Sequence, residues 1–215
     1  MMKIAVFGGT GPTGRHIIEE ALGRGHTLSV YTRDAAKLAG YAGRIDIVVG
    51  DLKDRDAIKT CIAGADAVIS ALGPNSLTSR EKRPIMQGVG TIISVMEELH
   101  VRRLIQISTA AYRDPKDGFD WKSRAFTLLF RLIVRNAFDD IQATADLVSR
   151  SRLDWTLVRI PNLKDGSATG GVEVGWYGRT KLATKLSRGN LARFLIDQAT
   201  AKDLVRKAPA IADRL

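Results

Sequence analysis

The chain has 215 residues, of which 45% are hydrophobic and 26% charged, and this balance indicates one globular domain over residues 1–215 rather than a disordered chain. No stretch approaches the roughly 20 uninterrupted apolar residues of a membrane span, and the N-terminal MMKIAVFGG lacks the architecture of a signal peptide, so we expect a cytoplasmic protein. The net charge of +10 is spread along the chain; it is compatible with nucleic acid, an anionic membrane surface or an anionic small ligand, and a solvated basic surface is the simplest interpretation.

Apolar runs typical of strands alternate with segments typical of helices through the first half of the chain. The run KIAVF at residues 3–7 is continuous, as expected of a strand buried on both faces. The alternation predicts an α/β fold, a Rossmann-like doubly wound parallel sheet with helices on both faces. We expect further strands at 28–32, 45–49, 67–71 and 103–108, and helices at 13–24, 57–63 and 85–99.

Beyond residue 108 the pattern becomes less regular. The polar stretch 109–121 predicts a loop, and the apolar residues after it recur at helical spacing on one broad face: Phe126, Leu129, Phe130, Ile133, Val134, Ala137 and Phe138. Interspersed arginines exclude a transmembrane helix, so we expect this face to pack on the body of the domain, with a substrate lid or a dimer surface as the alternative. A helix at 139–151, strands at 155–159 and 171–174, and a helix at 191–199 complete a single domain with a small C-terminal substrate-pocket region.

Side chains that commonly bind metals are sparse. Cys61 is the single cysteine and lies in AIKTCIAGA, where a small core residue is a simpler interpretation than a nucleophile. His16, His26 and His100 are far apart in the sequence and show no metal-ligand spacing with the cysteine or with each other. We therefore predict no metal site.

The stretch FGGTGPTGR, residues 7–15, follows the first expected strand and opens the first expected helix. Its glycines form GxxGxxG at Gly8, Gly11 and Gly14, which lets the backbone approach a pyrophosphate while the amides of the helix start favour its negative charge. Pro12 suits the first helical position because it lacks an amide hydrogen, and Thr13 can cap the helix or contact phosphate. The stretch therefore predicts a dinucleotide site.

The end of the second expected strand distinguishes the two nicotinamide dinucleotides. An acidic residue there would bind the ribose hydroxyls of NAD, but this chain has YTRDAAKL. Arg33 can grip a 2′-phosphate with two hydrogen bonds, and Lys37 adds a second positive charge about one helical turn later. We therefore expect NADP(H) in preference to NAD(H), with Asp34 capping the following turn; ordinary surface charge is the alternative for the two cations.

Residues after the other expected strands should also adjoin the cofactor, because ligands lie outside the carboxyl ends of a parallel sheet. Asp51 is placed to accept from the adenine amino group, and Leu52 is placed to cover its ring. Two further strand ends contribute small residues beside the nucleotide and hydroxyls near the nicotinamide: Ala71, Leu72, Gly73, Ser108 and Thr109.

The chain resembles the atypical short-chain dehydrogenase/reductase superfamily, and within it the NAD(P)H-binding proteins related to biliverdin reductase B, also called flavin reductase, and the NmrA-like proteins. The resemblance is carried by GGTGPTG, YTRDAAKL, VVGDLKD, ALGP, ISTAA and DDIQATADLVSRSRLDWTLVRIPNL, and it covers nearly the whole chain. It implies that NADP is bound by the glycine loop and the second strand end, and that two later segments adjoin the nicotinamide and line the pocket. The residues so implied are Thr10, Gly11, Thr13 and Arg33, then Ser108 and Thr109, then Pro161 and Asn162.

Proton donors of the related enzymes are missing from this chain. Typical short-chain dehydrogenases use a Tyr-xxx-Lys pair on a helix, and Tyr112 to Lys116 has that spacing, but Pro115 disfavours a helix there. Ile141 and Asn162 stand where the biliverdin reductase B-like enzymes have histidines. Ser108, Thr109 and Asn162 are therefore the candidate reaction-site residues, with Tyr112 a weaker candidate acid, and an acceptor that takes its proton from water needs none of them as an acid.

Two functions follow from these observations. The first is an NADPH-dependent reductase that transfers hydride to a small, flat, conjugated acceptor such as a flavin or quinone, with the region 109–141 and Asn162 shaping the pocket. The second is a non-catalytic NADP(H)-binding sensor of the NmrA-like type. Nucleic-acid binding is a weaker third possibility because only the charge favours it, and the sequence indicates no oligomeric state.

Overall fold

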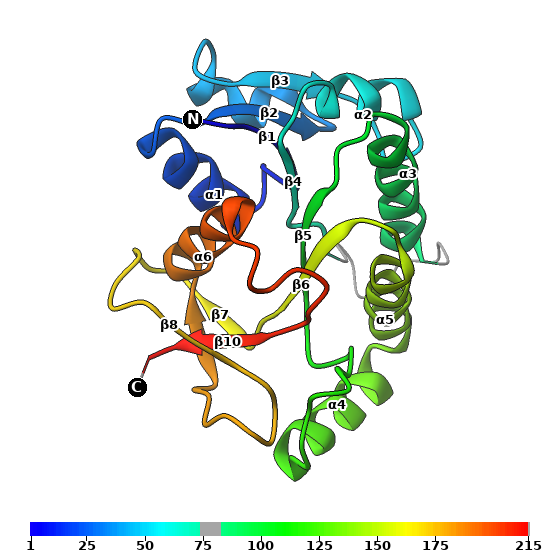
Figure 1. The fold of residues 1–215 in the computed structure, drawn as a ribbon, viewed down its shortest axis with the longest axis vertical. Coiled ribbons are helices and arrows are strands. Elements are labelled where there is room, and N and C mark those ends of the chain that lie inside the picture. Colours follow the sequence, from blue (N-terminus) through cyan, green and yellow to red (C-terminus); the bar gives the residue numbers. More distant parts are fainter. Residues whose placement is uncertain (74–82, 215) are drawn as a thin grey trace.

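One mixed sheet of eight strands forms the centre of the part of the chain described by this computed structural model, residues 1–73 and 83–214 (Figure 1). Neighbouring strands are parallel, except that the last, β8, runs antiparallel to β10. The strands, in spatial order, are β3 (Asp46–Val49), β2 (Thr27–Thr32), β1 (Lys3–Phe7), β4 (Ala67–Ser70), β5 (Arg103–Ser108), β6 (Asp154–Arg159), β10 (Ala210–Asp213) and β8 (Val172–Gly175).

Helices cover both faces of the sheet. Figure 1 shows α1 (Pro12–Gly23) and α6 (Arg188–Thr200) on one side, and α2 (Arg55–Ile62), α3 (Pro84–Glu98) and α5 (Arg135–Arg150) on the other. Residues of β1 alternate between the two cores, because successive side chains of a strand point to opposite faces. Ile4 and Val6 join the core under α1 and α6, while Ala5 and Phe7 join the core under α2, α3 and α5. This two-sided burial explains the continuous apolar run.

The doubly wound parallel sheet expected from the sequence is confirmed. Each element expected up to residue 108 is present, with ends displaced by no more than two residues. A short 3₁₀ helix, η1 (Ala35–Tyr41), follows β2. Three short strands were not expected: β10, and the pair β7 (Asn162–Lys164) and β9 (Lys185–Ser187), which form a separate parallel two-stranded sheet.

The single apolar helix face expected over residues 126–138 is wrong. The helix α4 (Trp121–Ile133) ends at a break where Val134 has φ −131° and ψ 53°, and α5 begins at Arg135. Val134, Ala137 and Phe138 are buried, whereas Leu129 and Ile133 are 55% and 70% exposed, so only the later half of the face packs on the domain. The break turns the two halves in different directions; the side chain of Phe126 lies outside the described part.

Candidate functional site

The loop between β1 and α1 approaches its neighbours too closely for side chains. Gly8 has φ +85°, and a Cβ there would lie 2.9 Å from the carbonyl oxygen of Ala71 at the end of β4. A Cβ on Gly14 would lie 2.2 Å from the carbonyl oxygen of Gly8, and the Gly11 amide donates to that oxygen at 3.2 Å. Glycine is therefore required at Gly8 and Gly14 by the tight turn and by the packing of α1 on it.

The first turn of α1 is suited to an anion. Gly11 is the N-cap, Pro12 occupies the start of the helix, and neither a side-chain cap nor an acidic residue is present in the first turn. Backbone amides at such a start carry a partial positive charge, and nothing acidic opposes a phosphate. Thr10 and Thr13 are half-buried beside this turn. These residues therefore fit the pyrophosphate of a dinucleotide.

Three cations gather beside the end of β2. Arg33 and Lys37 are exposed, and Arg15 of α1, which the sequence analysis did not include, donates from Nη2 to the Lys37 carbonyl oxygen at 3.3 Å. Asp34 accepts from the Ala36 amide at 3.0 Å, which confirms the expected cap, and its carboxylate is 3.9 Å from Lys37 Nζ. The signal that could have identified Arg15 was its place directly after Gly14, the last glycine of the motif.

The loop after β3 is held by its own hydrogen bonds. The Asp51 carboxylate accepts from the Lys53 amide at 2.7 Å, and the Asp51 carbonyl accepts from the Tyr31 hydroxyl at 2.7 Å. Leu52 packs against α3, where a Cβ on Gly88 would lie 2.8 Å from it. The Asp51 carboxylate thus already accepts one hydrogen bond within its own turn. Leu52 contacts α3 beside the carboxyl ends of the strands.

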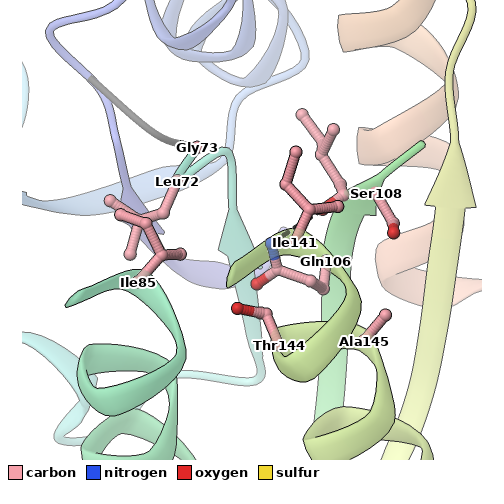
Figure 2. A pocket seen from close by; sticks show the side chains of 9 residues that line it. Leu72, Gly73, Ile85, Gln106, Ser108, Ile141, Thr144 and Ala145 are labelled. Atoms are coloured by element: carbon pink, nitrogen blue, oxygen red, sulfur yellow. Dashed lines mark hydrogen bonds between the residues drawn. The ribbon is translucent and has the colours of Figure 1, made fainter. Parts of the chain in front are cut away.

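A narrow cavity lies where β4 and β5 end, between the start of α3 and α5 (Figure 2). Its volume is about 20 Å³, enough for roughly one water molecule, so the described residues form the floor of a site rather than a complete pocket. None of the lining side chains ionises near neutral pH. They are Leu72, Gly73, Ile85, Gln106, Ile107, Ser108, Ile141, Thr144 and Ala145.

Two buried polar atoms in this lining lack a hydrogen-bond partner among the described residues. They are the Ser108 hydroxyl and the Oε1 atom of Gln106, whose amide nitrogen donates to the Ile107 carbonyl at 2.8 Å. Buried polar atoms nearly always have a hydrogen-bond partner. Two buried atoms without one in the same cavity are therefore typical of a ligand-binding position. Ser108 was expected from its place at a strand end. Gln106 was not, although a glutamine inside the apolar strand RLIQIS was a visible signal.

Asp140 fixes one wall of the cavity and was also not expected. Its carboxylate is buried and accepts from the amides of Ile85 at 3.1 Å and Met86 at 2.9 Å. It therefore caps the start of α3 from the neighbouring helix α5, where a negative charge is favoured by the helix dipole. The Thr144 hydroxyl donates to the Asp140 carbonyl at 2.8 Å. The two contacts of the Asp140 carboxylate join α3 to α5 beside the cavity.

The other reaction-site candidates do not reach this lining. Thr109 accepts from the Ala111 amide at 3.2 Å, and Asn162 is exposed at the start of β7, next to the half-buried Pro161. Tyr112 lies in a bend rather than a helix. Lys116 Nζ lies 5.0 Å from the centre of the Trp176 ring. The structure brings Ser108, Leu72 and Gly73 together, but it forms no helical Tyr-xxx-Lys pair.

The loop after β5 is clamped by a buried ion pair. The Arg159 side chain is fully buried, and its guanidinium binds both Asp117 carboxylate oxygens, at 2.6 and 2.8 Å. It also donates to the Ala208 and Tyr112 carbonyls at 2.7 and 3.3 Å, and its charge lies 4.9 Å from the centre of the Tyr177 ring. The Arg159 side chain of β6 thereby joins the loop of residues 112–117 to Ala208 and to Tyr177.

Other predicted features can be placed briefly. Cys61 is buried, and burial raises the pKa of its thiol to about 11, which supports the expectation of a core residue rather than a nucleophile. Within residues 1–73 and 83–214 no cluster of three or more His, Cys, Asp or Glu could hold a metal ion, and no helix is long and apolar enough to cross a membrane.

Sequence comparison agrees with this geometry. Residues 8–202 match the NAD(P)H-binding family, which covers most of the chain, including the glycine loop, the strand ends and the cavity. A doubly wound sheet with such a loop is typical of dinucleotide-binding proteins. This protein belongs to the NAD(P)H-binding family.

Individual relatives and solved structures are more distant. An isoflavone reductase homolog from Zea mays is 36% identical over 37% of this chain and 29% of its own length. A 4-hydroxy-2-methyl-3-oxo-4-farnesyl-3,4-dihydroquinoline-1-oxide ketoreductase from Stigmatella aurantiaca is 26% identical over 51% of this chain and 34% of its own length. The chain thus spans about a third of these relatives. A short-chain dehydrogenase/reductase from Veillonella parvula, solved in complex with NADP, superposes with a TM-score of 0.78 at 14% identity over 99% of this chain and 94% of its own, and shows the fold.

Proposed function

We propose that this protein is an NADPH-dependent reductase that transfers hydride to a flat, conjugated acceptor of the flavin or quinone class. The observation that carries the proposal is the cavity beside the glycine loop, where the Ser108 hydroxyl and the Gln106 carbonyl oxygen have no hydrogen-bond partner among the described residues and lie among side chains that do not ionise. Such a lining suits a planar ring that needs a few hydrogen bonds and no proton donor from the protein.

The cofactor assignment rests on the family and on the two charged regions. The start of α1 would hold the pyrophosphate, and Arg33, Lys37 and Arg15 would hold the 2′-phosphate. NADPH supplies the hydride when it is bound. Gly8 contacts Ala71, and the next two residues line the cavity, so a dinucleotide bound on the loop would lie next to the cavity that Ser108 lines.

The acceptor class is supported by the absence of acids in the lining and by the relatives. The maize protein is named for an isoflavone reductase, whose substrate is a flat, conjugated ring system, and the Stigmatella protein is named as the ketoreductase of a farnesylated dihydroquinoline. Reduced flavins and quinones exchange protons with water, so the role left to this chain is to hold donor and acceptor face to face.

The test is NADPH oxidation with FMN and with menadione as acceptors, followed by the loss of nicotinamide absorbance against a protein-free control. We expect protein-dependent oxidation, and a Ser108→Ala variant that is slower by roughly tenfold, because a hydrogen bond in a buried site is lost. A protein that binds NADPH, shown by fluorescence titration, but oxidises none of it with either acceptor would contradict the reductase assignment.

The same observation leaves the sensor as the second candidate function. A lining without an acid or base also suits a protein that binds NADP(H) and reports it to a partner. Binding of NADPH without turnover, together with cofactor-dependent association with a partner, would favour the sensor over the reductase.

A further inference from the structure

The helix α4 presents an apolar face to solvent. Four adjacent side chains on its later turns, which we term the α4 face, are Leu128, Leu129, Leu132 and Ile133, with exposures of 58%, 55%, 73% and 70%. Phe119 and Trp121, at the start of the helix, are 72% and 64% exposed. Single exposed leucines are common on proteins, but several large apolar side chains exposed side by side indicate an interaction surface.

The charged residues in the sequence from Trp121 to Phe138 are all basic. Between Trp121 and Phe138 the sequence contains Lys122, Arg124, Arg131 and Arg135 and no acidic residue. Arg124 stacks 4.8 Å from the centre of the Phe119 ring, and Arg131 lies 5.9 Å from that of Phe138. Of these described arginines, only Arg135 approaches a carboxylate, that of Asp139 at 3.8 Å. Aliphatic side chains, aromatic rings and positive charge therefore lie together on α4 and on the residues next to its two ends.

This combination distinguishes among the possible occupants. A second copy of the chain would bring two basic rows together in a protein whose net charge is already +10, and repulsion opposes that contact. Nucleic acid would pair with the arginines but leave the leucines in water. An anionic bilayer surface satisfies both, because the apolar side chains enter the boundary of the acyl chains while the arginines contact the lipid phosphates.

We infer that α4 is a docking helix for an anionic membrane surface. The helix lies in the plane of the interface and does not span it, since its 13 residues extend about 20 Å. It is joined to the start of α5, which reaches the cavity at Ile141, so the bound molecule has the cavity end of the sheet toward the bilayer (Figure 1). If the proposed reductase function holds, a lipid-soluble acceptor is then available at the site.

The experiment is flotation of the full chain with vesicles of phosphatidylglycerol and phosphatidylcholine, compared with phosphatidylcholine alone. We expect binding to the anionic vesicles, weakened about tenfold or more both by Leu132→Asn/Ile133→Asn and by Arg124→Gln/Arg131→Gln. The matched controls are Val49→Asn, at a valine that is 54% exposed on β3, and Lys181→Gln/Lys202→Gln, at exposed lysines outside α4; both should bind as the parent does.

These substitutions replace exposed side chains, and circular dichroism of each variant checks that the fold is retained. The inference is overturned if the protein fails to float with anionic vesicles, or if the α4 variants bind as well as the controls. A second result would also overturn it: light scattering shows that the parent protein is a dimer and that the Leu132→Asn/Ile133→Asn variant is a monomer, and neither the parent nor the variant binds the vesicles. Flotation needs no turnover, so its outcome is independent of the reductase assay.

Discussion

Arg159 carries a guanidinium that is fully buried in β6, and Asp117 is the carboxylate that neutralises it. Removing one partner of a buried pair leaves the other charge uncompensated, which costs far more than the pair itself contributes. We expect Asp117→Ala to lower the free energy of unfolding by roughly 3–5 kcal/mol, measured by denaturant titration. The loop 109–120 should also become susceptible to proteolysis, because the clamp that holds it is lost.

A surface ion pair provides the matched comparison for this prediction. Asp165 binds Arg188 at 2.7 Å, a distance similar to that in the buried pair, but the Asp165 side chain is 86% exposed. Water screens this pair, so Asp165→Ala should cost less than about 1 kcal/mol. Equal losses in the two variants would show that the buried guanidinium is solvated when its partner is removed.

The proposed preference for NADP depends on Arg33. Its exposed side chain lies beside Lys37 and Arg15, where a 2′-phosphate would be bound. We expect Arg33→Ala to weaken NADPH binding about tenfold or more and NADH binding little, because charge-assisted hydrogen bonds to phosphate are lost only with the former. Fluorescence titration with both cofactors measures this, with Lys202→Ala as the control for a change in net charge. Equal losses for the two cofactors would contradict the assignment.

At the scale of the element, α3 depends on a cap from another helix. The side chain of its N-cap residue, Arg83, makes no capping hydrogen bond. The Asp140 carboxylate accepts from the amides of Ile85 and Met86 instead. We expect Asp140→Ala to destabilise the fold by about 1–2 kcal/mol, seen as a lower melting temperature, and to loosen the cavity wall. Asp139→Ala, at a half-buried neighbour in a long contact with Arg135, should have little effect. A similar loss in both would show that the cap is dispensable.

The elements that the sequence predicted well are those specified by local pattern. The strands and helices up to Ser108 were found because each has its own apolar period and its own turn residues. The break at Val134 was missed because Val134 fits the apolar spacing of both flanking helices. The strand β10 was missed because AIAD has no alternation, and it is specified by its partners, Arg159 in β6 and residues 172–175 in β8.

The candidate site divides in the same way. Leu72, Gly73 and Ser108 could be predicted because the ends of parallel strands meet at one edge of the sheet. Gln106 and Ile107 come from β5 itself, and the other lining residues come from α3 and α5, whose approach depends on the Asp140 cap, a contact across 55 residues of sequence. Asn162 stays a prediction: β7 pairs with β9, Asn162 is exposed there, and it is not among the residues that line the cavity.

At the scale of the whole molecule, the strand order determines where a ligand can bind. The chain winds outward from β1 to β2 and β3, and then in the other direction from β4 to β6. The helices after β1 and β4 consequently leave the sheet on opposite faces and open a crevice between the strands. The glycine loop and the cavity both lie at this reversal, so two features far apart in the sequence form one candidate site.

The core also limits the pH range in which function can be measured. Burial raises the pKa of Cys61 to about 11 and that of Tyr177 to about 12. As the pH rises, the unfolded chain loses these protons first, near the ordinary values of about 8.5 and about 10. The stability that the two protonated groups contribute is therefore complete below about pH 8.5 and is lost as the pH rises through the folded values. Rates should be compared below that limit.

Within this range the proposed reductase should show no pH dependence of its own. None of the cavity side chains ionises, so we expect the rate of NADPH oxidation with menadione to stay constant within about twofold from about pH 7, above the titration of the 2′-phosphate, to about pH 8.5. Tyr112→Phe should leave the rate unchanged, because Tyr112 lies outside the lining and offers its carbonyl, not its hydroxyl, to Arg159. The contrary result is a rate that changes with pH in the parent protein, together with a Tyr112→Phe variant whose rate is at least about tenfold lower and no longer changes with pH. That result would identify Tyr112 as a proton donor and exclude an acceptor protonated by water.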